Sequence, residues 1–308
     1  MKKIKLLLGY FLFFMLLFLL AFNPSFSKSK TKIEILIPLG PTVIPFSTMI
    51  PQYSSQDLDM NFTIWRNIDE LVIRVKENKY DVIIAPFITL VNLYNKGVKI
   101  KHLSTFNWAS FYLVSKKPIR NLNELAGKEV YIAQRGSTQD VIFNIYLNEK
   151  GLRDKINIFY GSPQEITALF SVGKIDLALL PEPFVTFCIF NNGRIVLDLQ
   201  KAYKSITGKN LPITSIFVRS DLDKKTVENI DKIFRENFKN FAKNKDLYCE
   251  KSSTILNLDY KIVKEALKRL SFIYLGISAK KDLSTFIQFI YEKEPELIGG
   301  KLPEELIF

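Results

Sequence analysis

The sequence predicts an α/β protein of two lobes, in which each lobe is a mostly parallel sheet flanked by helices. The chain has 308 residues, more than one ordinary domain of about 100–200 residues requires. Hydrophobic residues make up 47% of the chain, which is enough to build sizeable cores. Short apolar segments that end at proline alternate with segments of helical periodicity, and this alternation is typical of βαβ units.

Strands and helices are predicted along most of the chain. We expect strands at 33–37, 62–65, 81–85, 129–133, 175–179 and 213–218. We expect helices at 68–75, 122–126, 138–150, 163–173, 227–241, 260–270 and 282–292. Two of the helix ends carry local signals. Gly151 follows one helix as a left-handed C-terminal cap, and the run 162–165 (SPQE) opens another as a capping box.

Two segments are predicted to carry the chain between the lobes. Residues 109–116 and 213–220 are rich in β-formers, and each adjoins a turn signal that contains proline. No low-complexity linker separates the halves. The predicted first lobe is therefore discontinuous and combines 31–114 with 213–308, whereas the second lobe is 115–212.

The first 27 residues have the layout of a secretory signal peptide. Three lysines precede an unbroken apolar run, 6–22, and Ser25 and Ser27 follow a helix-breaking Asn-Pro pair. We therefore expect cleavage near Lys28. The alternative is a retained membrane anchor, because the apolar run is at the lower limit for spanning about 30 Å of hydrocarbon. Both interpretations place the bulk of the protein outside the cytoplasm, in the periplasm or on the outer face of the membrane.

Composition excludes several classes of function. Lys and Arg outnumber acidic residues by 43 to 31, but they are spread over predicted helices, so we expect no nucleic-acid partner. One histidine, His102, and two cysteines are too few for a four-ligand Cys/His site, and we expect neither a metal nor a cofactor. We expect Cys188 and Cys249 to be buried free thiols. A disulfide between them is the alternative in an oxidising compartment.

Common catalytic motifs are missing from the sequence. It contains no GxSxG elbow, no GxxxxGK[ST] loop, no HExxH and no GxGxxG after a strand. A Ser-His-Asp hydrolase would have to use His102, which we expect to be an ordinary surface or strand-end residue. We therefore expect a protein that binds a ligand without catalysis.

Five motifs occur in order in the middle of the chain. They are 121–133 (NLNELAGKEVYIA), 136–138 (GST), 162–165 (SPQE), 173–178 (GKIDLA) and 181–183 (PEP), with 79–86 (KYDVIIAP) upstream. This set, which covers roughly residues 33–220, resembles the nitrate, sulfonate, taurine and thiamine-precursor branch of type II periplasmic solute-binding proteins of ABC importers.

The resemblance implies a monomeric receptor with a ligand cleft between two lobes, which close on a small solute and deliver it to an ABC permease and its ATPase. The segment 40–46 is more apolar than a tight anion clamp, so an oxyanion-bearing and a heteroaromatic solute both remain candidates. The same fold is used by lyases of menaquinone synthesis and by a thiamine-pyrimidine synthase, but those enzymes are cytoplasmic. A membrane-anchored ligand sensor is a further alternative.

Candidate ligand-binding residues follow the predicted strands, because ligands of open α/β sheets bind beyond the carboxyl ends of the strands. They are Gly40, Pro41, Thr42, Pro86, Phe87, Arg135, Gly136, Ser137, Thr138 and Glu182, with Trp108 as an aromatic platform.

The segment 136–138 has the chemistry of an anion site. Gly136 permits close approach, Ser137 and Thr138 supply hydroxyls, and the helix that follows presents free N–H groups. The alternative is that the hydroxyls only cap that helix. Glu182 either meets a ligand group or faces solvent, and the two aromatic candidates either line the cleft or pack the lobes.

Overall fold

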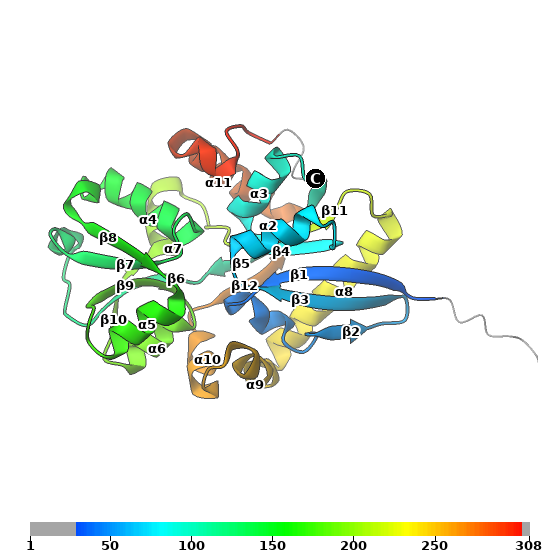
Figure 1. The fold of residues 1–308 in the computed structure, drawn as a ribbon, viewed down its shortest axis with the longest axis horizontal. Coiled ribbons are helices and arrows are strands. Elements are labelled where there is room, and N and C mark those ends of the chain that lie inside the picture. Colours follow the sequence, from blue (N-terminus) through cyan, green and yellow to red (C-terminus); the bar gives the residue numbers. More distant parts are fainter. Residues whose placement is uncertain (1–28, 304–308) are drawn as a thin grey trace, which may run out of the picture.

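The computed structural model describes residues 29–303 as two sheets covered by helices (Figure 1). The predicted signal peptide, 1–27, and the cleavage site near Lys28 lie outside the described residues. We refer to the seven-stranded sheet and its helices as the first lobe, and to the five-stranded sheet and its helices as the second lobe.

The first lobe is built on a sheet of order β12-β5-β11-β4-β1-β3-β2. Its strands are β1 (Thr31–Pro38), β2 (Gln52–Ser54), β3 (Leu58–Trp65), β4 (Val82–Pro86), β5 (Ile100–Ala109), β11 (Thr214–Arg219) and β12 (Ser271–Leu275). Strand β1 runs parallel to β3 and β4, and the other pairs are antiparallel. Ile35, Leu36 and Ile37 of β1, whose side chains alternate between the two faces of the sheet, are at most 2% exposed, as expected for a central strand that is covered on both faces.

The second lobe is built on a sheet of order β10-β6-β9-β7-β8. Its strands are β6 (Phe111–Ser115), β7 (Glu129–Ala133), β8 (Asn157–Gly161), β9 (Leu177–Pro181) and β10 (Arg194–Asp198). Strand β7 is parallel to β8 and β9, whereas β6 is antiparallel to its neighbours. The two-lobed α/β fold is confirmed, but both sheets are mixed. The expected parallel pairing holds only for the βαβ strands, because the strands next to the lobe crossings run the other way.

Helices cover both sheets (Figure 1). They are α2 (Ile68–Lys76), α3 (Phe87–Asn95), α4 (Thr138–Glu149), α5 (Pro163–Ser171), α6 (Phe184–Phe190), α7 (Leu199–Thr207), α8 (Lys224–Lys243), α9 (Lys245–Leu256), α10 (Tyr260–Ala266) and α11 (Lys280–Lys293). Short 3-10 turns lie at Pro41–Phe46, Leu122–Leu125, Arg153–Lys155, Ile277–Ala279 and Pro295–Ile298. The predicted capping box of α5 is confirmed, since Ser162 and Glu165 each accept from the other's backbone N–H. The helix expected at 260–270 ends at Ala266, because the apolar residues that follow pair with β5 as β12.

The chain passes between the lobes at two places. It leaves the first sheet at Ser110, between β5 and β6, and returns at 208–213, between α7 and β11. Gln200 of α7 brackets the first crossing: its Oε1 accepts from the backbone N–H groups of Ser110 and Phe111, and its Nε2 donates to the Phe111 carbonyl. Gln200 therefore ties this crossing to the second lobe through both N–H and carbonyl groups of the backbone.

A shared apolar core joins the lobes beside these crossings. Tyr203 of α7 is fully buried, and its ring lies 5.9 Å from that of Phe286 and 5.5 Å from that of Phe289, both on α11. This core is continuous with residues of both sheets. These contacts join the lobes beside the place where the chain crosses between them.

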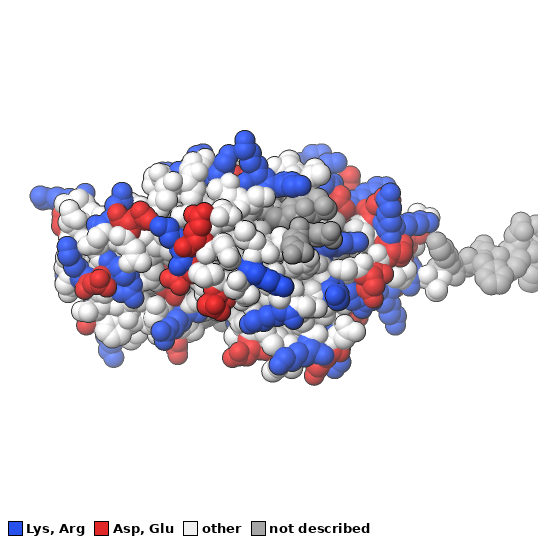
Figure 2. Space-filling view, turned by 90° about the horizontal axis from the view of Figure 1, so that it is seen from above, with Lys and Arg blue, Asp and Glu red and all other residues white. Residues whose placement is uncertain are grey.

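The surface mixes charges of both signs. Lys and Arg side chains alternate with Asp and Glu over the face shown in Figure 2. Within residues 29–303, no helix combines the length and the apolar character needed to cross a bilayer.

Candidate functional site

A cavity of about 120 Å³ lies between the lobes, at the carboxyl ends of the parallel strands of both sheets. We call it the interlobe cavity. The first lobe contributes Pro38, Leu39, Gly40, Pro41, Thr42, Trp65, Arg66, Ile68, Pro86, Asn107, Ile213 and Thr214. The crossing and the second lobe contribute Ser110, Phe111, Ala133, Gln134, Ser137, Thr138, Gln139, Pro163, Pro181 and Phe184. This position is where open α/β sheets bind their ligands.

Unpaired polar atoms cluster around the interlobe cavity. Five of its side chains are at most 4% exposed and carry a polar atom that has no hydrogen-bond partner among the described residues. These atoms are Trp65 Nε1, Asn107 Oδ1 and Nδ2, Ser110 Oγ, Thr138 Oγ1 and Gln139 Oε1. A buried polar group without a partner costs about 1–3 kcal/mol, and native proteins keep few of them. Their gathering at one cavity indicates a site for a polar solute.

The N-terminal end of α4 lies at the cavity. Ser137 is the N-cap: its hydroxyl oxygen accepts from the Asp140 N–H at 3.4 Å, and its hydroxyl donates to the Ala133 carbonyl at 3.1 Å. Gly136, at φ 74°, donates its N–H to the Asp140 carboxylate at 2.8 Å. Thr138 has no such role, so the Ser137 hydroxyl is committed to the helix while the Thr138 hydroxyl remains for a ligand.

The side chain of Gln139 is also held with one polar atom free for a ligand. Its amide nitrogen donates to the Ala133 carbonyl at 2.6 Å, which leaves its Oε1 as a buried acceptor at the cavity. Arg135 lies on the other side of this turn, with its guanidinium 5.5 Å from the ring of Tyr160. The loop after β7 therefore presents amide and hydroxyl groups to the cavity and places its one guanidinium elsewhere.

The structure brings six of the predicted residues to the interlobe cavity and places five elsewhere. Gly40, Pro41, Thr42, Pro86, Ser137 and Thr138 line it. Phe87 opens α3 and packs against Phe286 in the core, because a helix begins directly after its strand. Trp108 donates its Nε1–H to the Ile273 carbonyl and lines a different hollow, which Gln200 and Leu211 also line. Arg135 and Gly136 belong to the α4 turn without facing the cavity.

Glu182 is fully buried and does not line the cavity. Its Oε1 accepts from Arg269 Nε at 2.5 Å, and its Oε2 accepts from the backbone N–H and hydroxyl of Thr186. Burial raises the pKa of this carboxyl, while the bonds from Arg269 and Thr186 act in the opposite direction. Both sequence-based alternatives for Glu182, a ligand contact and a solvated carboxylate, therefore give way to a buried ion pair.

Several lining residues were not predicted, among them Trp65, Arg66, Asn107, Ser110 and Gln139. Trp65 and Arg66 end a strand that was predicted, so the rule that selected Gly40 also applies to them. Gln139 follows the same strand as Thr138, so the rule covers it as well, whereas Asn107 and Ser110 carry no such signal. Asn107 lies in a strand that is antiparallel to its partners, and its place at the cavity depends on the chain crossing that follows.

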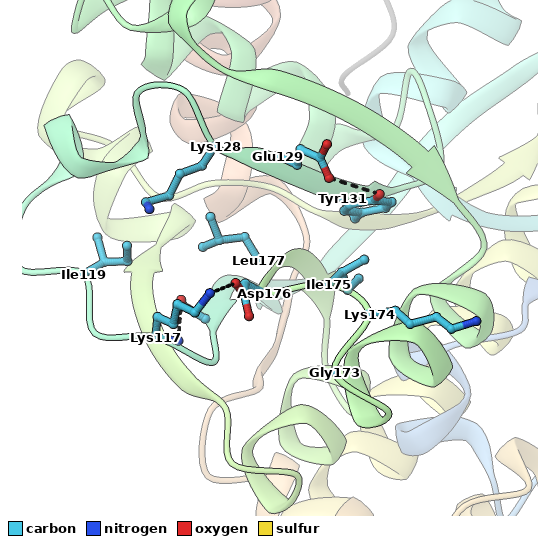
Figure 3. Close-up of a pocket in the computed structure, with 11 residues that line it drawn as sticks. Lys117, Ile119, Lys128, Glu129, Tyr131, Gly173, Lys174, Ile175, Asp176 and Leu177 are labelled. Carbon is cyan, nitrogen blue, oxygen red and sulfur yellow. Dashed lines mark hydrogen bonds and ion pairs between the residues drawn. The ribbon is translucent and has the colours of Figure 1, made fainter.

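A larger hollow, of about 340 Å³, lies at the opposite end of the second sheet (Figure 3). Three of its charged groups are engaged: Lys117 pairs with Asp176, and Glu129 accepts from the hydroxyl of Tyr131 (Figure 3). It lies at the amino ends of β7 and β9, where the sheet offers no helix N-terminus. The interlobe cavity is therefore the better candidate.

The soft ligands lie apart from the site. No group of three His, Cys, Asp or Glu residues in the described chain could hold a metal ion. His102 is 7% exposed within β5, not at the surface or a strand end, and burial lowers its pKa to about 3. Cys188 and Cys249 are buried and free, as predicted.

Comparison with known proteins places the chain in a family. A family model described as menaquinone biosynthesis matches residues 41–292. A search of curated proteins finds no match.

Solved structures share the fold over most of their length. An ABC transporter from Parabacteroides distasonis is 22% identical, with 91% of this chain and 99% of the other covered at a TM-score of 0.74. The periplasmic aliphatic sulphonate binding protein of Escherichia coli is 15% identical, with 90% and 96% covered at 0.70. The alkanesulfonate-binding protein of Xanthomonas axonopodis pv. citri, bound to MOPS, is 14% identical, with 91% and 97% covered at 0.64. The fold is therefore the type II periplasmic-binding-protein fold.

Proposed function

The chain belongs to the menaquinone biosynthesis family, and from this premise and the geometry of the interlobe cavity we propose that it is a solute receptor. Its two lobes close on a small solute about the crossings at Ser110 and 208–213 and release it to an ABC permease, which is driven by an ATPase. Hinge closure around a ligand is the usual action of such two-lobed proteins. On this proposal the first lobe is 31–109 with 214–303 and the second lobe is 111–207, because β6 (Phe111–Ser115) pairs in the second sheet and the predicted boundary at 114 lies inside it.

The observation that carries this proposal is the set of unpaired buried atoms at the cavity. Asn107 and Trp65 come from the first lobe, whereas Thr138 and Gln139 come from the second. A solute bound to all four would join the lobes and satisfy atoms that are otherwise unpaired. Each bond would contribute about 0.5–1.5 kcal/mol net, or about 1.5–3 if the solute group is charged.

The lining also indicates the chemistry of the solute. Donors at Trp65 Nε1 and Thr138 Oγ1, together with the start of α4, favour a negatively polarised group. Phe111 and Phe184 supply apolar walls, and exposed Arg66 stands at the mouth. These features favour a small solute with an oxyanion or a polar heteroaromatic edge. At about 120 Å³ the cavity is well below the 300–1,000 Å³ of pockets for drug-sized ligands, so the solute is small or the lobes must open further for it.

The ionisable groups of the site favour binding over catalysis. Arg66 is the one ionisable side chain among the lining residues, and the hydroxyls of Ser110 and Thr138 have no imidazole or carboxylate beside them in this lining. General acid–base chemistry requires a titratable group within hydrogen-bond reach of the reacting atom. We therefore propose that the protein returns its ligand unchanged.

A second candidate function is supported by the family match. A family described by menaquinone biosynthesis leaves open an enzyme that acts on a small precursor in this same cavity. The two functions predict different fates for the ligand, so one experiment distinguishes them.

The experiment uses purified residues 29–308. A thermal-shift screen of oxyanions, alkanesulfonates, pyrimidines and amino acids identifies a ligand, and mass spectrometry then compares the compound before and after overnight incubation. The receptor proposal expects stabilisation and full recovery of the unchanged compound. Conversion of the compound with turnover would contradict the receptor proposal and support the enzyme.

We propose an extracytoplasmic location on the signal-like layout of residues 1–27. Intact-mass analysis of the protein from the cell envelope is expected to give a chain that begins near Lys28. A mass that retains residues 1–27 in the membrane fraction would support the anchored alternative, and recovery in the cytoplasm would contradict both.

A further inference from the structure

The segment after α10 ties the first lobe to the second through a buried ion pair. Arg269 donates from Nε to Glu182 Oε1 and from Nη2 to the hydroxyl of Thr186, each at 2.5 Å. Its own carbonyl accepts from the Tyr112 hydroxyl at 2.8 Å. The Glu182 side chain is fully buried, and that of Arg269 is 21% exposed. We call these four residues the interlobe latch.

We propose that the interlobe latch holds the lobes closed and so sets how tightly the interlobe cavity retains its ligand. In this role Arg269 is a positioning residue that acts through Glu182 and touches no ligand. The predicted effect on ligand affinity rests on the proposed function, whereas the predicted effect on the distance between the lobes does not.

The latch and the ligand seat share one turn of the second lobe. Glu182 lies between Pro181 and Phe184, which both line the interlobe cavity. Its backbone N–H donates to the Ser110 carbonyl at 2.8 Å, and the Ser110 hydroxyl is one of the unpaired atoms at the cavity. The carboxylate that holds Arg269 is therefore part of the same short segment that shapes the cavity wall.

The other half of the latch belongs firmly to the first lobe. Arg269 lies between α10 and β12, and β12 pairs with β5 in the seven-stranded sheet. Helix α10 packs beside α6, which starts two residues after Glu182 (Figure 1). If the lobes separate at this side, Arg269 must leave the buried Glu182 carboxylate.

Burial distinguishes this pair from other ion pairs that join the lobes. Lys293 of α11 and Glu149 of α4 also pair, at 2.7 Å, but each side chain is 42% exposed. Exposed pairs contribute little because water screens them, whereas the removal of one partner from a buried pair leaves an uncompensated charge. The chain thus supplies its own matched control, an interlobe pair of similar length without burial.

The effect on affinity follows from populations. A ligand that binds only the closed state has an apparent Kd equal to its intrinsic Kd divided by the closed fraction. A latch that keeps the ligand-free protein mostly closed therefore keeps the apparent Kd close to the intrinsic Kd. Without the latch, the closed fraction and the affinity fall by the same factor, although no ligand contact has changed.

The test uses three latch variants and one control. Arg269→Gln removes the charge, Arg269→Lys keeps the charge but loses the two-pronged geometry, and Tyr112→Phe removes one hydrogen bond with little risk to folding. Lys293→Gln removes the exposed pair. Spin labels on Asp69→Cys and Gln164→Cys, exposed positions next to residues that line the cavity mouth, report the distance between the lobes without any ligand. Both native cysteines are fully buried and should not take the label.

We expect Arg269→Gln to shift the ligand-free distance distribution to longer values and to raise the ligand dissociation rate about tenfold or more, with Arg269→Lys and Tyr112→Phe in between. Lys293→Gln should match the parent in both. If Arg269→Gln fails to fold, as circular dichroism would show, Tyr112→Phe decides the matter.

Unchanged distances and rates in every folded latch variant would overturn the proposal, and so would an equal shift in Lys293→Gln. If no ligand is found, or if the ligand is converted, the receptor proposal fails by itself. The ligand-free distance measurement still decides whether the latch holds the lobes.

Discussion

Replacing Asn107 by leucine should stabilise the ligand-free protein and weaken ligand binding at the same time. Asn107 is fully buried, and neither of its amide atoms has a hydrogen-bond partner among the described residues. Leucine has the same branched shape without polar atoms, and the adjoining cavity gives room for its larger methyl groups. The substitution therefore removes an unpaired buried group from the free protein and two hydrogen-bonding atoms from the site.

The two effects can be given magnitudes. Removal of an unsatisfied buried polar group should raise the free energy of unfolding by about 1–3 kcal/mol. Loss of two hydrogen bonds to the ligand, each about 0.5–1.5 kcal/mol, should weaken binding by about 5- to 150-fold. Stability and affinity thus move in opposite directions, as is common where a site keeps groups for its ligand.

Urea unfolding without ligand and calorimetric titration with the ligand from the screen measure the two quantities. The matched control is Asn237→Leu. Asn237 is also buried, but its Nδ2 donates to the Pro45 carbonyl and its Oδ1 accepts from the Tyr248 hydroxyl. Its replacement should destabilise the protein. If Asn107→Leu destabilises the protein as Asn237→Leu does, and leaves the affinity unchanged, the reasoning is refuted and Asn107 is a structural residue.

Three further predictions follow from the described contacts. Ser137→Ala should lower the free energy of unfolding by about 1 kcal/mol with little loss of ligand affinity. Thr138→Val should weaken ligand binding with little change in the free energy of unfolding, and equal losses of affinity in the two variants would contradict this division of roles. Because burial lowers the pKa of His102 to about 3, the imidazole stays unprotonated in the folded state, whereas in the unfolded state it gains a proton below about pH 6.5. Between pH 7 and pH 5 the free energy of unfolding should therefore fall by about 2 kcal/mol more in the parent protein than in His102→Gln. Urea unfolding at each pH measures this difference, and parallel pH curves for the two proteins would contradict it. Burial raises the pKa of Cys188 to about 12 and that of Cys249 to about 11, so iodoacetamide should modify both only in denaturant, and mass spectrometry of labelled native protein would detect any exception.

Local sequence signals located the strand ends that build the site. Apolar runs that stop at proline predicted β1 and β4, and with them Gly40 and Pro86 at the cavity. These signals succeed because they depend only on neighbouring residues: proline cannot continue a strand ladder, and a capping side chain such as that of Ser137 marks the start of its helix. The same reasoning predicted α4 and Thr138.

Contacts between distant residues could not be predicted in this way. Glu182 and Arg269 are 87 positions apart in the sequence, and only the packing of α6 against α10 brings them together. Phe87 and Trp65 both end or follow strands, yet one lies in the core and the other at the cavity. That difference depends on which face of the sheet the next element covers, which no local pattern records.

The order of strands in the first sheet has a consequence for how the chain folds as it is made. Strand β5 joins β1–β4 only through β11, which is more than a hundred residues further on, and β12 comes later still. The second sheet is different, because all of its strands lie within 111–198. During synthesis the second lobe can therefore complete itself early, whereas the larger sheet must wait for the last third of the chain. Until β11 has been made, β5 has no partner that joins it to β4, and the larger sheet stays open at that edge.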